Sequence, residues 1–275
     1  MMQTIYAEVE LLRKRPSTWI LLGIWAVMSG MFGYVVPYID RNEAAAGGGI
    51  TDLLPASVAT TALSGFPFFG GVIVLIMAVM AFGGDYGWNV VKTLFTQRSS
   101  RLQVFGSKFA AIAIWLLPFV LVTFAVSIVA SLIVASAESA SNDLQSIGTI
   151  AVGLLAAWLI LAVWAALGIL LATLTRGTSI AIGVGILYGL VIEGLLSAFL
   201  DGVDALSPLI QGLLRTNAYS LVQPIGDISE IARGNGPGAF SGPYVGGAQS
   251  LAVLIAYLAA LTATSALIIN RRDVA

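Results

Sequence analysis

The sequence contains no histidine and no cysteine, so chemistry that depends on an imidazole or a thiol has no side chain to perform it. Zinc therefore lacks its usual nitrogen and sulfur ligands, and disulfides and thiol nucleophiles are excluded. The acids are scattered, but Glu193 lies inside the apolar run YGLVIEGLLSAF. A carboxylate inside a membrane span marks a functional site by default. Two interpretations remain open: a contact in a translocation path or at a gate, and a carboxyl group hydrogen-bonded to a neighbouring helix.

Nucleotide hydrolysis has no recognisable motif here. A P-loop requires the pattern G-x-x-x-x-G-K-[ST], in which a glycine-rich turn and a lysine hold the phosphates. In the nearest string, Ser107 separates Gly106 from Lys108, and Phe109 stands where the hydroxyl is required. No serine has a histidine to activate it. We therefore expect a non-catalytic chain that carries no cofactor and no metal of its own.

The composition indicates the solvent of this protein. Hydrophobic residues make up 58% of the chain and charged residues 10%, with a mean hydropathy of +0.95. Soluble domains contain roughly 45–50% apolar and about 25% charged residues. A soluble domain has no interior large enough for this apolar excess, so the sequence predicts an integral membrane protein.

Six apolar stretches approach the roughly 20 residues that a helix needs to cross the hydrocarbon. They predict a single all-α transmembrane domain over residues 1–275, with spans at 18–38, 56–82, 109–135, 147–174, 179–199 and 249–269. Residues 1–17 are expected to form an interfacial elbow helix that Pro16 ends. The long connection at 200–248 is expected to hold one or two short extracellular helices before the last span.

The basic residues predict the orientation, because cytoplasmic loops carry an excess of Lys and Arg. With both termini in the cytoplasm, the inner segments carry Arg13, Lys14, Arg15, Lys92, Arg98, Arg101, Lys108, Arg176, Arg271 and Arg272. The outer segments then carry only Arg41, Arg215 and Arg233. This asymmetry predicts a multi-pass protein with both termini in the cytoplasm.

The connection at residues 83–108 is polar and basic, although it lies between two long apolar runs. Four of its residues can form one apolar helical face: Val90, Val91, Leu94 and Phe95. Lys92 lies beside this face and Arg98 lies past its end. Such a helix suits a groove on a partner protein. The alternative is an ordinary basic loop that membrane topology alone explains.

The same connection carries a resemblance to a known family. It reads Asp85, Gly87, then TLFTQRSSR over residues 93–101, then Gly106-Ser107-Lys108, and the chain ends INRRD at 269–273. Together with the elbow helix, the six spans and the long outer loop, this pattern resembles the permease subunits of ABC-2-type transporters. It departs from the family pattern at Asp85, where Glu is usual, at Trp88 and Asn89, where Gly-Thr is common, and at Arg98, where Pro is frequent.

The resemblance implies a division of labour. Two copies of a separate cytoplasmic ABC ATPase would bind ATP and Mg, and a short helix from this connection would couple them to the spans. The implied coupling residues are Asp85, Gly87, Val90, Val91, Leu94, Phe95, Arg98 and Arg101. A second permease chain, identical or homologous, would complete the path. The implied function is export of a hydrophobic or amphiphilic cargo (a lipid, a peptide antibiotic or a drug) across a bacterial inner membrane.

Small residues predict where helices approach each other closely, because they let backbones come together. Ser29 with Gly33 and Gly185 with Gly189 have the four-residue spacing that puts both on one helix face, which would suit contact between two permease chains. Two other classes remain open. An ion-coupled transporter or channel would use Glu193, and a non-transporting membrane anchor or sensor would need no path. Lipids are expected around the chain, and nucleic acid is not expected as a partner.

Overall fold

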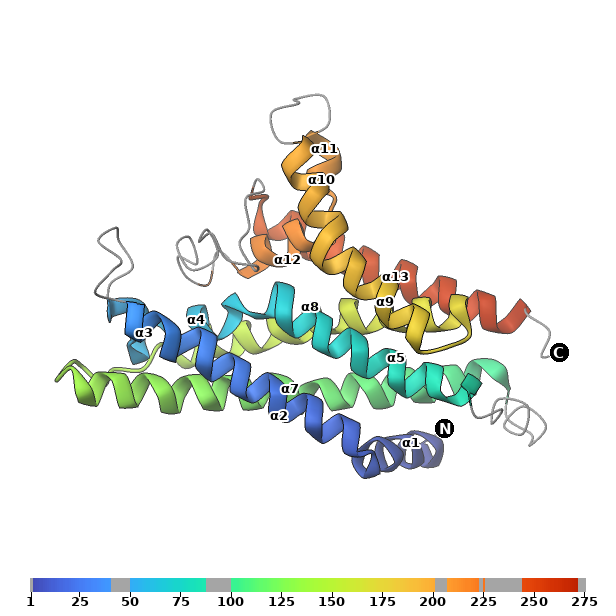
Figure 1. Ribbon diagram of the computed structural model, residues 1–275, viewed down its shortest axis with the longest axis horizontal. Coiled ribbons are helices and arrows are strands. Elements are labelled where there is room, and N and C mark those ends of the chain that lie inside the picture. The colour runs from blue at the N-terminus through green and yellow to red at the C-terminus, as the bar shows by residue number, and fades with distance from the viewer. Residues whose placement is uncertain are drawn as a thin grey trace.

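The computed structural model describes residues 2–40, 50–87, 100–200, 207–222, 225 and 244–271. These residues are predominantly helical, and none of them forms a strand. Four helices are long and apolar enough to cross a membrane: Pro16–Ile39, Leu102–Ala137, Ile147–Thr175 and Gly247–Arg271. Figure 1 shows these helices in an elongated bundle. The prediction of an all-α, multi-pass membrane protein is therefore confirmed at this level.

The chain begins with two helices separated at a proline. Helix α1 spans Met2–Lys14 and helix α2 spans Pro16–Gly30. Arg15 between them is extended, with φ −77° and ψ 119°. The ring of Pro16 disfavours helical geometry at the preceding residue, and proline fits well at the first helical position. A helix is therefore present over most of residues 1–17 and ends just before Pro16, and its placement at the membrane interface stays a prediction.

Three apolar runs contain π-helical turns instead of continuous α-helix. The turn η1 (Met31–Val35) joins α2 to α3 (Val36–Asp40). The turn η4 (Phe66–Gly70) joins α4 (Val58–Ser64) to α5 (Gly71–Gly87). The turn η5 (Tyr188–Ile192) joins α9 (Ser179–Leu187) to α10 (Glu193–Leu200). Short 3-10 turns, η2 (Ile50–Leu53) and η3 (Pro55–Ser57), precede α4. The second and fifth expected spans correspond to the last two of these interrupted runs.

The third expected span begins earlier than the sequence suggested. Helix α7 (Arg101–Ala137) contains 37 residues, about 55 Å at 1.5 Å per residue. The hydroxyl of Ser100 caps it by accepting a hydrogen bond of 3.2 Å from the N–H of Gln103. Since α5 continues to Gly87, residues 83–87 and 101–108 belong to helices, and the expected 83–108 connection shortens to 88–100. Helices α8 (Ile147–Thr175) and α13 (Gly247–Arg271) lie within two residues of their expected bounds.

Helix α8 forms the centre of the bundle and packs against α5 and α13. Of its two tryptophans, Trp164 is fully buried. Glycines allow its neighbours to approach closely: a Cβ at Gly168 would lie 2.8 Å from the carbonyl oxygen of Leu75, and one at Gly71 would lie 2.4 Å from Nε1 of Trp164. Thus α8 approaches the backbone of α5 at Gly168, and α5 approaches the ring of Trp164 at Gly71.

The glycines that were expected at a contact between two permease chains pack against helices of the same chain. A Cβ at Gly185 would lie 2.5 Å from a methyl carbon of Leu75, and one at Gly189 would lie 2.8 Å from the ring of Trp164. A Cβ at Gly33 would meet the methyl group of Thr61 at 3.8 Å. The prediction of close helix packing holds, but the partners of these glycines are α4, α5 and α8. Gly185 and Gly189 thus pack within this chain, and a contact between two permease chains stays a prediction.

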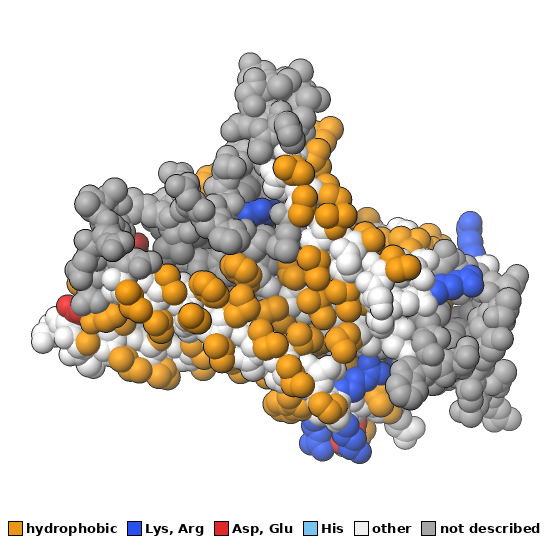
Figure 2. All heavy atoms as spheres, in the orientation of Figure 1, with side chains coloured by type: hydrophobic (Ala, Val, Ile, Leu, Met, Phe, Trp, Pro, Cys, Tyr) orange, Lys and Arg blue, Asp and Glu red, His pale blue; other side chains and the backbone are white. Residues whose placement is uncertain are grey.

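Two short helices lie between α10 and α13, as expected for part of residues 200–248. They are α11 (Ser207–Gln211) and α12 (Leu214–Val222). In Figure 1 the run from α9 to α10 rises away from the long axis of the bundle, and α12 lies beside α13. Figure 2 shows hydrophobic side chains over much of the visible face and basic side chains gathered towards the end that carries α1.

Candidate functional site

Glu193 is the first residue of α10 and directly follows the π-helical turn η5. Its residue exposure is only 1%. One carboxylate oxygen, Oε1, accepts hydrogen bonds from the Tyr188 hydroxyl at 2.6 Å and from the Leu214 N–H at 2.9 Å. The other, Oε2, accepts from the Arg215 N–H at 2.9 Å. The carboxylate therefore joins the fifth apolar run to the start of α12.

These bonds cap α12 from another helix. The first N–H groups of any helix lack intrahelical partners, and an acidic group near them is favoured by the helix dipole. A turn at Gly212 and Leu213 separates α11 from α12, and the Tyr257 hydroxyl of α13 donates to the Gly212 carbonyl at 2.9 Å. The N-terminus of α12 is thus fixed from two sides, by α10 and by α13.

Arg215 lies in the same cluster and is only 7% exposed. Its guanidinium carbon lies 5.6 Å from the centre of the Tyr219 ring, one turn along α12, a distance typical of a cation–π contact. Burial raises the pKa of the Tyr219 hydroxyl above its usual value, and Arg215 acts in the opposite direction. From the sequence, Arg215 was expected only as one of the outer-loop cations. Its signal was its place as the lone charge in the apolar segment LIQGLLRTNAYSLV.

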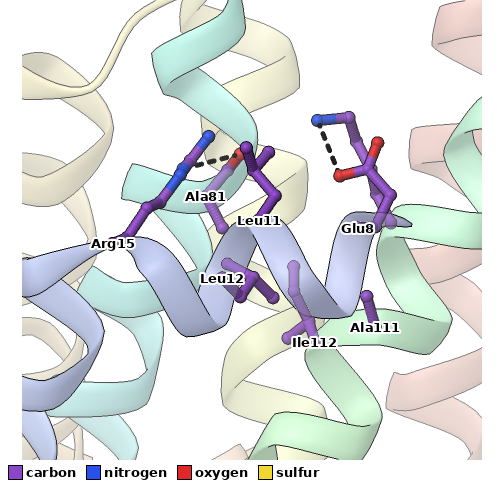
Figure 3. A pocket seen from close by; sticks show the side chains of 8 residues that line it. Glu8, Leu11, Leu12, Arg15, Ala81, Ala111 and Ile112 are labelled. Atoms are coloured by element: carbon purple, nitrogen blue, oxygen red, sulfur yellow. Dashed lines mark hydrogen bonds and ion pairs between the residues drawn. The ribbon is translucent and has the colours of Figure 1, made fainter. Parts of the chain in front are cut away.

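A second polar cluster joins α1 to the helices that flank the expected coupling segment (Figure 3). Nζ of Lys108 in α7 lies 3.5 Å from Oε2 of Glu8 in α1, with side-chain exposures of 8% and 15%. Nη1 of Arg15 donates to the carbonyl oxygens of Met80 and Ala81 in α5, at 3.0 and 3.4 Å. We call this set of contacts the α1 clamp. It ties one helix to both α5 and α7.

Two further features complete the α1 clamp. Nε1 of Trp115 in α7 donates to the carbonyl of Val9 at 3.1 Å. Between α1, α5 and α7 lies a small cavity of about 10 Å³, which is close to the least space that one water needs. The residues around it are Glu8, Leu11, Leu12, Arg15, Ala81, Lys108, Ala111 and Ile112. The cavity is therefore a packing gap in the clamp, too small for an organic ligand.

The expected coupling residues are only partly placed. Asp85 and Gly87 belong to the last turns of α5, and Arg101 is the first residue of α7. The others, Val90, Val91, Leu94, Phe95 and Arg98, lie outside the described residues. Lys108 was counted among the basic residues of the inner connection, but its side chain is buried and faces Glu8 in the α1 clamp. Glu193 belongs to the separate cluster around α12.

The contacts in these two clusters hold helices in position relative to one another. Among the residues that the structure describes, no group of three or more acidic, Cys or His side chains is placed to hold a metal ion. The carboxylate of Glu193 already accepts three hydrogen bonds, and these bonds fix the position of a helix. The α1 clamp likewise fixes three helices relative to one another.

Comparison with known proteins gives a family and no function. No curated protein matches the chain. Residues 19–275 match a family described as "Protein of unknown function (DUF2705)". That match covers all of the chain except the elbow helix and the start of α2, so the protein belongs to the DUF2705 family.

Proposed function

We propose that this chain is the membrane-spanning permease subunit of an ATP-driven exporter. Two copies of a cytoplasmic ABC ATPase would bind ATP and Mg and dock on residues 85–101, and a second permease chain would complete the path. The cargo would be hydrophobic or amphiphilic, in keeping with a bundle that carries little fixed charge between its ends. The chain would lie in a bacterial inner membrane with six spans and both termini in the cytoplasm.

The α1 clamp is the observation that supports this proposal most. Arg15 holds α5 about two turns before Gly87, and Glu8 holds Lys108, about two turns after Arg101. The helices on both sides of the 88–99 segment are thus fastened to the same short helix. A push on that segment would move α1, α5 and α7 together. A coupling segment requires such a rigid base.

The arrangement of the ends supports an even number of spans. In Figure 1, α1 and the last turn of α13 lie towards the same end of the long axis of the bundle. Arg13, Lys14 and Arg271 lie at this end, in keeping with the excess of basic residues on the cytoplasmic side of membrane proteins. Six spans require the interrupted runs 58–87 and 179–200 to cross the membrane as well.

The test is affinity purification of the tagged protein from native membranes in mild detergent, with mass spectrometry and an ATPase assay on the eluate. The test variant is the double substitution Leu94→Asp and Phe95→Asp. Its matched control is Leu144→Asp with Ile147→Asp, two exposed apolar residues in and beside the α7–α8 connection. We expect a soluble ATPase with a Walker motif to co-purify with the wild-type and control proteins, and to be lost from the test variant.

Two outcomes would overturn the proposal. One is a chain that elutes without any ATPase from the native membrane. The other is retention of the ATPase by the test variant at the control's level, which would remove the coupling role of residues 94 and 95. Equal loss in both variants would assign the effect to general damage from two added charges, and a single substitution at Leu94 would then replace the pair.

An ion-coupled transporter is the second candidate, and the burial of Glu193 favours it. It predicts uptake or efflux driven by an imposed ion gradient in vesicles that contain this chain alone. An exporter subunit would stay inactive in that assay without its ATPase. A chain that is inactive in both assays would fit a membrane anchor or sensor.

A further inference from the structure

Helix α12 has an unusual composition for its position. Eight of its nine residues are buried: Leu214, Arg215, Thr216, Asn217, Ala218, Tyr219, Ser220 and Val222. A helix that is buried on all sides is normally apolar all round. Here five of the buried residues are polar or amphipathic, and the helix packs against α4, η4, α8 and α13. The bundle therefore encloses a helix whose composition is typical of a helix in contact with water.

Some of these polar groups are satisfied. The Asn217 amide nitrogen donates to the carbonyls of Gln211 and Leu213, at 2.8 and 2.7 Å. The Ser220 hydroxyl accepts from the N–H of Val245 at 3.1 Å. These bonds hold α12 to the turn before it and to the residues that lead into α13.

Oγ1 of Thr216 and Oδ1 of Asn217 are among the buried polar atoms that have no hydrogen-bond partner in the described part of the chain. Both residues have an exposure of 0%. Leaving a buried polar atom unpaired costs free energy, because its hydrogen bonds to water are lost and not replaced. Thr216 and Asn217, adjacent residues of α12, both contribute this unfavourable free energy. A second position of α12, in which both atoms meet water or a polar group of a passing solute, would remove it.

The closed position is held largely through Glu193. Its carboxylate bonds to two consecutive N–H groups at the start of α12 and to Tyr188 in the π-helical turn η5. Hydrogen bonds from N–H groups to a carboxylate are stronger than those between neutral groups, but they require the end of the helix to face the carboxylate. π-Helical turns often occur at functional sites. A change of this turn would carry Glu193 away from α12.

We propose that α12 is a gate helix and that Glu193 is its latch. In the closed state the latch holds α12 inside the bundle, with Thr216 and Asn217 sealed from water. In the open state the latch is broken, α12 tilts about the turn at Gly212 and Leu213, and its polar face meets water. The device needs no ATPase to exist, so it goes beyond the proposed function and can be tested without it.

The absence of cysteine makes the test direct. Thr216→Cys and Asn217→Cys each introduce the only thiol in the chain, and its reaction with a water-soluble maleimide reports exposure of α12. The assay uses the full-length protein, purified in detergent, so that both ends of the bundle meet water. The reference thiol is Ser107→Cys in α7, where the native residue is also 0% exposed.

We expect Thr216→Cys to react faster than Ser107→Cys in the otherwise unchanged protein, although both sites are fully buried in the closed bundle. Glu193→Ala should raise the rate at Thr216→Cys about tenfold further, since it removes three bonds from the latch, and should leave Ser107→Cys unchanged. Glu138→Ala is the matched control, because Glu138 also accepts a tyrosine hydroxyl, that of Tyr38 at 2.8 Å, but belongs to a different helix end.

The results separate a gate from a fixed plug. Equal rates at residues 216 and 107, with no change at residue 216 on Glu193→Ala, would overturn the proposal. An increase at both thiols would mean that Glu193→Ala unfolds the bundle. The test would then rest on the rates of Thr216→Cys and Ser107→Cys in the protein that keeps Glu193. None of these readings depends on an ATPase partner, so failure of the latch and failure of the exporter assignment are distinguishable.

Discussion

Two carboxylates in different parts of the bundle are held in different ways. Glu8 in the α1 clamp faces a cation, the ammonium group of Lys108 at 3.5 Å. Glu193 in the latch faces two backbone N–H groups at 2.9 Å and a phenol at 2.6 Å. An ion pair tolerates changes of angle, because attraction between charges depends mainly on distance. Hydrogen bonds to a helix end weaken steeply when the donors turn away.

The difference suggests different mechanical roles. The ion pair of the α1 clamp would persist while α1, α5 and α7 move as a unit. A rigid base for residues 88–99 requires this. The latch holds α12 firmly in one orientation and releases it in another. If the clamp behaves as an ion pair and the latch as a helix cap, substitutions in the two clusters should have different effects on stability.

The largest effect is expected in the α1 clamp, from Lys108→Met. It leaves the carboxylate of Glu8, only 15% exposed, without this cation. Breaking a buried pair from one side typically destabilises by roughly 3 kcal/mol or more. The free energy of unfolding should fall by about that amount in thermal or denaturant unfolding of the detergent-purified protein. The double variant Glu8→Gln with Lys108→Met should recover about half of it, because no charge then remains unpaired.

Lys14→Met is the control for this prediction. Lys14 lies 3.6 Å from Glu10, but its side chain is 74% exposed. Exposed pairs of this kind contribute about 0.5 kcal/mol or less. A loss at Lys108→Met no larger than at Lys14→Met would show that the clamp does not depend on its ion pair.

The next largest effect is expected in the latch, from Glu193→Ala. Loss of an external cap and of the hydrogen bond to Tyr188 should lower the free energy of unfolding by about 2 kcal/mol. In contrast to the clamp, removing the nearest cation should not compensate: Glu193→Gln and Arg215→Gln should be close to additive in denaturant unfolding. Strong non-additivity, like that expected for Glu8 and Lys108, would mean that the latch is an ion pair after all.

A smaller effect is expected in α9, which the turn η5 joins to the helix that carries the latch. Gly185→Ala introduces a Cβ that would lie 2.5 Å from Leu75, whereas Gly183→Ala meets nothing within 4 Å. We expect the first to destabilise by about 1–2 kcal/mol through overpacking, and the second to stabilise slightly through helix propensity. Thermal unfolding of both variants checks this. Equal effects would mean that α9 is not pressed against α5, and that the latch lacks a rigid base.

Much of the fold is readable from the sequence. Long apolar runs with few charges predict the helices α7, α8 and α13, because length and hydropathy decide whether a helix can cross a membrane. The break at Pro16 is also predictable from proline chemistry. The early start of α7 has a local signal, Ser100 with Gln103 three residues later, the spacing of a capping box. The apolar run begins only near Phe109, so hydropathy alone places the helix start too late.

The contacts that define the two clusters were less readable. Glu193 was identified because a carboxylate in an apolar run is rare, but its two partners in α12 lie more than 20 residues further along the chain. No local pattern connects them. Lys108 was placed in the polar connection because its neighbours in sequence are polar, whereas it belongs to α7 and faces Glu8. Spacing indicates which residues share a helix face, and only packing decides which helix that face meets.

The smallest effect is expected from Tyr188→Phe, which removes one bond of the latch and leaves both bonds to α12. The free energy of unfolding should fall by about 1 kcal/mol, the usual value for one hydrogen bond. Labelling at Thr216→Cys should rise only about twofold, since the cap on α12 remains in place. Tyr38→Phe, which breaks the bond to Glu138, is the control and should leave that labelling rate unchanged. A rise as large as that of Glu193→Ala would mean that the phenol orients the carboxylate, so that the π-helical turn, more than the helix end, sets the strength of the latch.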